Sequence, residues 1–350
     1  MIVVVTGGAG FIGSHVAEYY AAKGHSVRVI DNLSRASLLG KDGMTFDYNF
    51  EYLKTKENIE LIRGDIRDFD LLRPIVEDAD VVFHTAAQTA VTTSLTNPMP
   101  DFTTNALGTF HVLESARLSP KKPTVIYCST NKVYGDNVNR IGTVESLDRY
   151  EFPKEFRLGI PETFSIDMCG HTPYGCSKLA GDLYLQDYAE TFGLRTGVFR
   201  MSCIYGTRQF GLEDQGWLAW FAIATLLGKP IRIDGDGKQV RDVLYVTDLV
   251  ELYDKFLNSE LSHVVVNAGG GPANAIPIMK VIDLLSEKTG KRSPISFGDW
   301  RPSDQKVFIS DIRRAKELLG WEPKTDVQTG LGRMVKWITA HSDVFDAAFS

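Results

Sequence analysis

The first thirteen residues constrain the fold more than any other segment of the chain. An apolar run, Met1-Ile2-Val3-Val4-Val5, leads directly into Thr6-Gly7-Gly8-Ala9-Gly10-Phe11-Ile12-Gly13, and an amphipathic stretch follows at Ser14–Lys23. A short Val/Ile run, a glycine-rich turn and a helix are typical of the first step of a parallel sheet. Glycines permit a tight turn and close helix packing, and the helix N-terminus offers amides to a phosphate.

Short Val- and Ile-rich runs recur over the first 200 residues, separated by amphipathic stretches such as Leu107–Arg117. They predict buried strands at Ile2–Val5, Ser26–Ile30, Ile59–Ile62, Asp80–His84, Thr124–Cys128 and Thr196–Arg200. Alternation of this kind predicts an α/β fold, a Rossmann-type doubly wound parallel sheet.

Glycine and proline become frequent after about residue 200, which indicates a smaller C-terminal substrate-binding lobe. We therefore expect an NAD-binding domain over 1–200, with some later segments returning to it, and a mainly substrate-binding lobe over 201–350. Residues 136–170 carry few periodic signals and predict a long loop.

Composition excludes several classes of protein. The 38 basic and 44 acidic residues give a net charge of −6, which argues against a nucleic-acid partner. No apolar run approaches the ~18 residues of a membrane-spanning helix, so we expect no membrane insertion. A strand that starts at residue 2 leaves no room for a signal peptide, and the four cysteines lack zinc spacing. Reduced thiols, no metal and a cytoplasmic location are the simplest expectations.

The residues after the second, third and fourth predicted strands specify the expected cofactor. Asp31 lies about 20 residues after the glycine turn, where a carboxylate accepts ribose hydroxyls of NAD and repels a 2′-phosphate. Arg35 raises NADP as an alternative, but Asp31 favours NAD. Asp65 is either an acceptor for the adenine amino group or a plain turn residue. Ala86 and Ala87 either let the backbone pass close to the dinucleotide or pack against a helix.

Tyr174 and Lys178 are four residues apart, so a helix places both side chains on one face. A nearby ammonium lowers the pKa of a phenol, which predicts a base that takes a proton from a sugar hydroxyl. Lys178 can also bind the nicotinamide ribose. Thr130 follows the fifth predicted strand, where doubly wound sheets place their chemistry. It either bridges Tyr174 and the reacting hydroxyl or caps a helix.

Together these motifs resemble the extended short-chain dehydrogenase/reductases that act on nucleotide sugars. The similar stretches are Thr6–Gly13, Asp31-Asn32, Gly64-Asp65, Asn105 with Gly108-Thr109, Ser129–Gly135, Tyr174–Lys178, Arg241-Asp242 and Gly320-Trp321. The resemblance implies a catalytic set of Thr130, Tyr174 and Lys178. It implies NAD contacts from Gly7, Gly10, Phe11, Ile12, Gly13, Asp31, Asn32, Asp65, Ile66, Ala86, Ala87, Asn105, Tyr174 and Lys178. It also implies a homodimer through the helices of Leu107–Arg117 and Tyr174–Phe192, although packing within one chain explains the same apolar stripes.

Two positions narrow the reaction implied by this resemblance. Nucleotide-sugar 4,6-dehydratases carry Asp-Glu where this chain has Asn131-Lys132, and an amide cannot act as the acid for loss of water. Many 4-epimerases carry an asparagine where this chain has Cys203. The pattern is most similar to nucleotide-sugar 2-epimerases that use tightly bound NAD. A 4-epimerase or a reductase of the family stays open, as does a silent NAD-binding sensor.

The expected substrate is a nucleotide-diphosphate sugar. Candidate contacts are Gln88, Thr130, Asn131, Ser202, Gln209, Trp217, Arg241 and Arg301. The two arginines suit a diphosphate because a guanidinium binds phosphate in a planar fork, and surface ion pairs are the alternative. The spacing of Trp217 and Phe221 also suits an ordinary core helix face.

Overall fold

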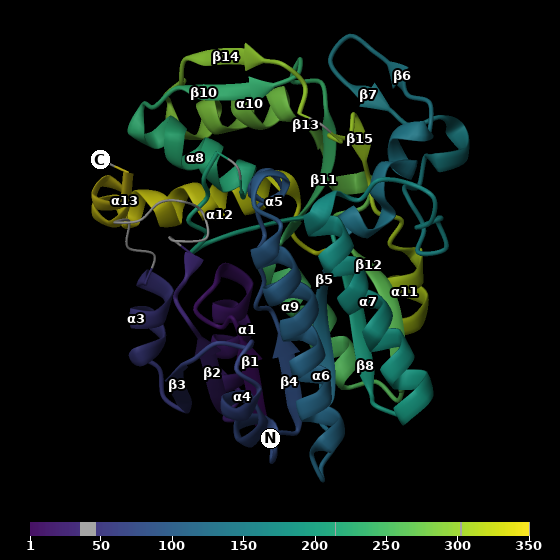
Figure 1. Ribbon diagram of the computed structural model, residues 1–350. Helices are drawn as coiled ribbons and strands as arrows, with labels where there is room; N and C mark the ends of the chain where they lie inside the picture. Colours follow the sequence, from purple (N-terminus) through teal and green to yellow (C-terminus); the bar gives the residue numbers. More distant parts are fainter. Residues whose placement is uncertain (36–46, 214, 302, 350) are drawn as a thin grey trace. The chain divides into compact units, whose positions relative to one another are not determined.

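The structure is a computed structural model that describes residues 1–35, 47–213, 215–301 and 303–349, with only the backbone described at 346–349 (Figure 1). The chain divides into two compact units. Unit 1 consists of Met1–Val133, His171–Arg200 and Val250–Val266, and unit 2 of Tyr134–Gly170, Met201–Leu249 and Asn267–Ser350.

Unit 1 is built on a seven-stranded sheet in the order β12-β8-β5-β4-β1-β2-β3. The strands are β1 (Ile2–Thr6), β2 (Ser26–Asp31), β3 (Ile59–Arg63), β4 (Val81–His84), β5 (Thr124–Thr130), β8 (Thr196–Met201) and β12 (His263–Ala268). All six predicted strands are confirmed, and β12 is an addition to them. Strands β1 and β4 are parallel neighbours, as are β1 and β2, so the chain order reverses beside β1. Doubly wound sheets bind ligands at such a reversal.

The helices of unit 1 are α1 (Phe11–Ala22), α3 (Tyr48–Lys54), α4 (Phe69–Val76), α5 (Val91–Thr96), the π-helical η1 (Asp101–Leu107), α6 (Gly108–Leu118), α7 (Thr172–Phe192) and residues 250–257 of α9 (Val246–Leu257). Alternate strand residues point to opposite faces of the sheet. Val82 packs in the core under α4, α6 and α7, whereas its neighbour Phe83 packs on Tyr20 of α1 and Tyr253 of α9. Figure 1 shows α6 and α7 side by side on one of these faces.

Unit 2 contains a sheet in which β11 (Val240–Tyr245) pairs with β9 (Cys203–Tyr205), β13 (Ala275–Pro277) and β15 (Val307–Phe308). A second pair joins β10 (Ile231–Asp234) and β14 (Ile295–Gly298). The helices of unit 2 are α8 (Trp217–Leu227), α10 (Ile278–Thr289), α11 (Arg313–Leu319), α12 (Val327–Ala340) and α13 (Ser342–Phe349), with a short η4 (Pro272–Asn274). No helix in the described part of the chain is long and apolar enough to cross a bilayer.

Residues 134–170 group with unit 2, whereas the sequence analysis placed them in the first domain. Short elements occupy this segment and its start: η2 (Asn131–Arg140), β6 (Val144–Glu145), β7 (Tyr150–Glu151) and η3 (Lys154–Phe156). Two bonds within unit 2 explain the grouping. The Tyr134 hydroxyl donates to Asn267 Oδ1 at 2.7 Å, and the Ile160 amide donates to the Ile309 carbonyl at 2.7 Å.

Candidate active site

The glycine turn closes tightly against the end of β4. Gly7 has φ +66°, and a Cβ there would lie 2.5 Å from the Cα of Ala86. A Cβ at Gly13 would lie 2.4 Å from the Gly7 carbonyl oxygen. Only glycine fits at these two positions, so the turn between β1 and α1 packs tightly on the end of β4, as the turn of a dinucleotide-binding sheet does.

The N-terminus of α1 has the character of a phosphate site. Gly10 is the N-cap and brings no side chain to cap the helix, and the first turn carries no acidic residue. The Ser14 amide bonds back to the Gly10 carbonyl at 3.0 Å, so the amides of Phe11, Ile12 and Gly13 precede the helical ladder. Such amides, together with the positive end of the helix dipole, favour a bound phosphate.

Asp31 closes the same turn from the end of β2. Its Oδ2 accepts the Ala9 amide at 2.9 Å and its Oδ1 accepts the Leu33 amide at 2.8 Å. Burial raises the pKa of this carboxyl. Each oxygen retains a lone pair for a ribose hydroxyl, which fits NAD. Burial lowers the pKa of Arg35 to about 10, which leaves that guanidinium charged at neutral pH.

Asp65 is already well supplied with donors. Arg67 donates to both carboxylate oxygens, at 2.9 and 2.6 Å, and Asn32 Nδ2 donates at 2.8 Å. These bonds, led by that of Arg67, lower the pKa of Asp65 to about 2. Ile66 is buried against Gly108, where a Cβ would lie 2.5 Å from its Cδ1. An adenine amino group would share the Asp65 carboxylate with Arg67 and Asn32.

Gln88 and Asn105 join the end of β4 to α7. The Gln88 amide donates to Asn105 Oδ1 at 2.8 Å, and Asn105 Nδ2 donates to the Gln88 carbonyl and to Ser177 Oγ, each at 2.9 Å. The Gln88 side chain donates to both oxygens of the buried Asp101, at 3.1 and 3.0 Å. The side-chain amides of Gln88 and Asn105 are therefore both hydrogen-bonded inside unit 1. A cofactor or a sugar would share these amides with their present partners.

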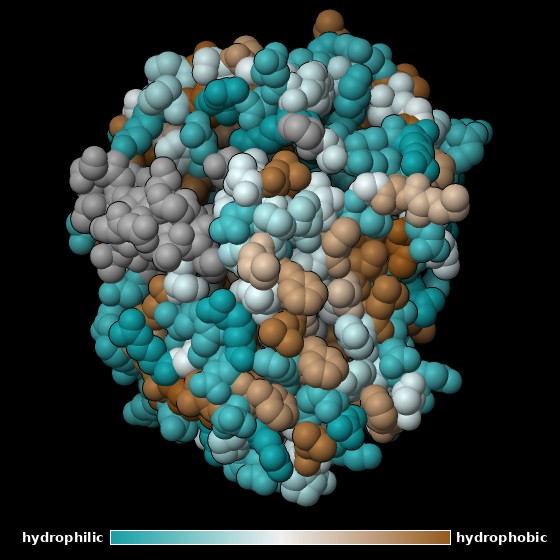
Figure 2. Space-filling model, viewed as in Figure 1, coloured by the Kyte–Doolittle hydropathy of each residue, from teal (hydrophilic) through white to brown (hydrophobic). Residues whose placement is uncertain are grey.

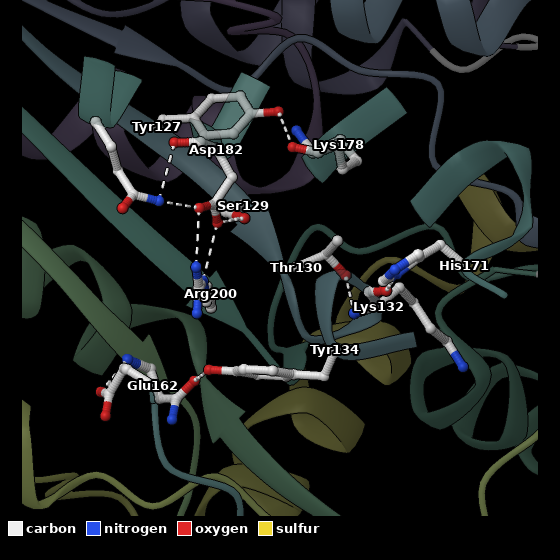
Figure 3. A network of polar contacts seen from close by, with 12 residues as sticks. Tyr127, Ser129, Thr130, Lys132, Tyr134, Glu162, His171, Lys178, Asp182 and Arg200 are labelled. Carbon is white, nitrogen blue, oxygen red and sulfur yellow. Dashed lines mark hydrogen bonds and ion pairs between the residues drawn. The ribbon is translucent and has the colours of Figure 1, made fainter. Parts of the chain in front are cut away.

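The three predicted catalytic residues come together in unit 1. Tyr174 and Lys178 lie on α7, 9% and 3% exposed, and Thr130 ends β5. Thr130 Oγ1 accepts the Lys132 amide at 3.2 Å (Figure 3). The Thr130 hydroxyl is also the side-chain hydrogen-bond partner that acts on the Tyr174 phenol. The bond to the Lys132 amide is the capping alternative, whereas bridging to a reacting hydroxyl stays a prediction. Asn131 Oδ1 accepts the Thr130 hydroxyl at 3.3 Å.

The predicted lowering of the Tyr174 pKa by Lys178 is wrong for the protein without a cofactor. Burial raises the pKa of Tyr174 to about 12, partly offset by the Thr130 bond, and Lys178 is not among the groups that act on it. Burial also lowers the pKa of Lys178 to about 8. Helical spacing places the two side chains on one face, but it does not reveal how completely water is excluded around them.

A buried ion pair that the sequence analysis missed lies one turn beyond Lys178. Arg200 of β8 donates to the two oxygens of Asp182, each at 3.0 Å (Figure 3). Ser129 Oγ donates to the same carboxylate at 2.6 Å and Gln186 Nε2 at 2.7 Å. Residues 174, 178 and 182 share one helix face. This spacing is the sequence signal that would have identified Asp182 as a charged neighbour of the two predicted catalytic residues.

The remaining candidate substrate residues lie in unit 2 and have partners there. Ser202 Oγ donates to the Asp242 carbonyl at 2.9 Å, and Gln209 Nε2 donates to the Ile204 carbonyl at 3.2 Å. The buried Gln209 Oε1 has no hydrogen-bond partner within the described structure. That unpaired acceptor is suited to a donor on a ligand.

The aromatic and basic candidates of unit 2 also have partners. Trp217 packs edge-on against Phe221 with ring centroids 5.4 Å apart, as a core helix face would. Arg241 Nη2 pairs with Asp304 Oδ1 at 2.7 Å, and Arg301 Nε pairs with Asp234 Oδ2 at 2.5 Å. Each guanidinium has five N–H groups, so donors remain for a phosphate.

No group of three or more His, Cys, Asp or Glu side chains in the described residues is arranged to hold a metal ion. All four cysteines, Cys128, Cys169, Cys176 and Cys203, are free thiols.

Comparisons with known proteins identify the family of the chain. Residues 3–269 match the model of the NAD dependent epimerase/dehydratase family. The chain is 38% identical to CDP-paratose 2-epimerase of Salmonella typhi over 97% of its own length and 100% of that protein. It resembles the UDP-glucose 4-epimerase of Thermotoga maritima, solved with UDP-glucose, with TM-score 0.80 and 31% identity over 98% and 100% of the two chains. It also resembles the UDP-glucose 4-epimerase of Thermus thermophilus, solved with NAD, with TM-score 0.78 and 29% identity over 97% and 99%.

The tight glycine turn, the uncapped start of α1 and the Asp31 carboxylate fit NAD, the cofactor of the matched family. The Rossmann-type sheet that carries them was predicted from the sequence and is confirmed. The chain is thus an enzyme that belongs to the NAD-dependent epimerase/dehydratase family.

Proposed function

We propose that the protein inverts C2 of a CDP-linked sugar and so interconverts CDP-paratose and CDP-tyvelose. The observation that carries this proposal is the similarity to CDP-paratose 2-epimerase of Salmonella typhi, which extends over the whole of that protein. A second candidate is inversion at C4. It is supported by 31% identity to a putative UDP-glucose 4-epimerase of Methanocaldococcus jannaschii over 96% of this chain.

The catalytic set suits a transient oxidation. NAD, when bound, supplies the hydride acceptor and a positive charge that favours the Tyr174 phenolate. Tyr174 then takes the proton of the sugar hydroxyl as the carbon is oxidised, and returns it when the other face of the ketone is reduced. Thr130 orients the phenol through their hydrogen bond. Lys178 holds the nicotinamide ribose with its ammonium group.

Asn131 and Lys132 argue against dehydration. Loss of water from a 4-keto sugar needs a general acid close to the reacting carbons. Asn131 carries an amide that bonds the Thr130 hydroxyl, and an amide has no proton to give at neutral pH. The epimerase branch of the family therefore suits this chain better than the dehydratase branch.

Residues of unit 2 are proposed to bind the nucleotide and the sugar. Arg241 and Arg301 would hold the diphosphate with the N–H groups that their carboxylate partners leave over. Gln209 would use its unpaired Oε1 for a donor on the ligand. Ser202 and Trp217 are the other substrate candidates of unit 2, and Gln88, Thr130 and Asn131 are the substrate candidates of unit 1.

We further propose a homodimer that forms through α6 and α7. Large apolar side chains are exposed on these two helices and at the end of η1, just before α6: Leu107, Phe110, Leu118, Leu183, Tyr184 and Phe192. The rings of Phe110 and Tyr184 are in contact at 5.8 Å, which joins the two helices into one apolar face. Figure 2 shows hydrophobic residues gathered over this part of unit 1.

A cytoplasmic location is also proposed, since free thiols are typical of a reducing compartment.

Proton NMR of the purified enzyme with CDP-, UDP- and GDP-sugars, with no cofactor added, tests the proposed reaction. Inversion at C2 of a CDP-sugar is the expected result. Inversion at C4 would transfer the protein to the second candidate. Net consumption of added NADH or NADPH would identify a reductase instead.

A further inference from the structure

Lys178 is buried next to an aromatic ring. Its ammonium nitrogen lies 4.1 Å from the ring centroid of Tyr127 on β5, and the Tyr127 side chain is fully buried. The Tyr127 hydroxyl donates to the backbone carbonyl of the same lysine at 3.2 Å (Figure 3). A Cβ at Gly181 would lie 2.5 Å from that hydroxyl, so a glycine on α7 makes room for it. Tyr127 therefore contacts both the backbone and the charged end of Lys178.

Charged partners of Lys178 are scarce. Within the described residues no carboxylate forms an ion pair with it. Asp182 favours the charged ammonium through space, but its carboxylate is bonded to Arg200, Ser129 and Gln186. Burial raises the pKa of the Cys128 thiol to about 11, so this thiol is neutral near pH 7. The ring of Tyr127, whose centroid is 4.1 Å from the ammonium, presents a face of negative character to Lys178.

The other ionisable groups around α7 do not replace this contact. His84 of β4 is fully buried, and burial, with the charge of Lys178, lowers its pKa to about 3, so it is neutral. Asp101 of η1 acts on Tyr174, and Glu114 of α6 bonds Arg117 and Tyr188. Tyr174 itself is protonated in the protein without a cofactor, because burial raises its pKa to about 12.

We propose that Tyr127 is a positioning residue for Lys178: the face of its ring holds the ammonium in place and stabilises the positive charge. The inference rests on the proposed role of Lys178 in holding the nicotinamide ribose. Burial lowers the pKa of Lys178 to about 8, so the ammonium is mostly charged at pH 7 and loses its proton at mildly alkaline pH. The attraction between a buried ammonium and the face of an aromatic ring is strong enough to raise the pKa of the ammonium by about one unit.

The ring and the hydroxyl can be separated by substitution. Tyr127→Phe keeps the ring and removes only the bond to the Lys178 carbonyl, whereas Tyr127→Leu removes the ring. Phe83→Leu is the matched control, because Phe83 is equally buried on the neighbouring strand and packs against Tyr20 and Tyr253, away from Lys178. Lys178→Met removes the titrating group.

The measurement is the amount of NAD that the purified holoprotein retains after incubation between pH 6 and 10 and removal of free nucleotide. Wild type, Tyr127→Phe and Phe83→Leu are expected to lose half of their NAD at the same pH. Tyr127→Leu is expected to do so about one pH unit lower. In Lys178→Met, the loss of NAD with rising pH that has this midpoint should be absent. An unshifted midpoint in Tyr127→Leu, or an equal shift in Phe83→Leu, overturns the proposal.

If the Tyr127→Leu protein does not fold, a second substitution tests the same contact. Pentafluorophenylalanine at position 127 keeps the shape of phenylalanine but reverses the charge distribution of the ring. Its midpoint should fall below that of Tyr127→Phe, and equal midpoints contradict the proposal. A step that persists in Lys178→Met would show that Lys178 does not control NAD binding, which removes the premise. None of these results depends on which sugar carbon is inverted, so the proposed C2 reaction stands or fails separately.

Discussion

The carboxylate of Asp182 and the guanidinium of Arg200 form a two-point ion pair, with side chains 0% and 5% exposed, inside unit 1. The pair ties α7, which carries Tyr174 and Lys178, to β8. Ser129 Oγ adds a bond from β5 to the same carboxylate. The Asp182–Arg200 pair, one turn from Lys178, is therefore a polar anchor of the catalytic helix.

Removal of one partner from this pair should be costly. Asp182→Asn removes the negative charge that Arg200 binds at two points, and breaking a buried pair costs about 3–5 kcal/mol. Urea denaturation should show this loss in the free energy of unfolding. Glu190→Gln is the control, because Glu190 is exposed on the same helix, and its loss should stay below about 0.5 kcal/mol. A loss under 1 kcal/mol in Asp182→Asn would contradict the anchoring role.

Tyr174→Phe should reduce epimerisation by at least about 100-fold, because the phenol is the proposed base. The thermal stability of the protein should change little, since in the described residues Thr130 is the one side chain that acts as a hydrogen-bond partner of the phenol. Tyr184→Phe on the exposed face of the same helix serves as the control and should keep its rate within about twofold. Full activity in Tyr174→Phe would exclude this residue as the base.

Two helical glycines should respond oppositely to alanine. A Cβ at Gly13 would meet the Gly7 carbonyl oxygen at 2.4 Å, whereas at Gly332 of α12 the nearest atom lies 3.8 Å away. Gly13→Ala is expected to lose bound NAD, as measured by nucleotide release from the purified protein. Gly332→Ala should keep NAD and gain up to about 1 kcal/mol of stability from helix propensity. Normal NAD content in Gly13→Ala would refute the assignment of this turn to the cofactor.

Asp101 should make stability depend on pH. Burial raises the pKa of this carboxyl from 3.8 to about 6, so between these values the folded state binds more protons than the unfolded state. Stability from this group is therefore fully present below pH 3.8 and declines as the pH rises to about 6, by about 1–3 kcal/mol. Denaturation of wild type and Asp101→Asn across pH 4–7 should yield a difference curve with this slope. Parallel curves would show that the carboxyl titrates normally.

The proposed dimer predicts the mass of two chains by light scattering. Leu183→Arg places a charge in the middle of the α6–α7 face and should give monomers, because an unpaired charge is costly to bury. Leu147→Arg, 94% exposed in unit 2, is the matched control and should stay dimeric. If wild type already has the mass of one chain, the apolar face has another role.

Much of the fold could be predicted because buried parallel strands are short and rich in Val and Ile, and six of them stand out before residue 200. Strand β12 was missed because His263–Ala268 lies beyond the change in composition. The placement of 134–170 could not be read from the sequence either, since it depends on distant bonds such as Tyr134–Asn267.

The candidate site was predictable where motifs depend on spacing and not where chemistry depends on burial. The positions of Tyr174, Lys178 and Thr130 followed from spacing and strand ends. The high pKa of Tyr174 did not, because a linear pattern carries no measure of exclusion of water. Asp182 and Arg200 escaped notice because a charged residue on a helix is usually solvated, and only the folded chain brings the pair together.

The central claim is that hydride leaves C2 and returns to the same carbon. The most direct measurement uses a CDP-paratose substrate deuterated at C2, incubated with the purified enzyme in ordinary water without added cofactor. The account predicts CDP-tyvelose that retains deuterium at C2, seen by mass spectrometry and NMR. Inverted product that has lost its deuterium to the solvent would contradict the account.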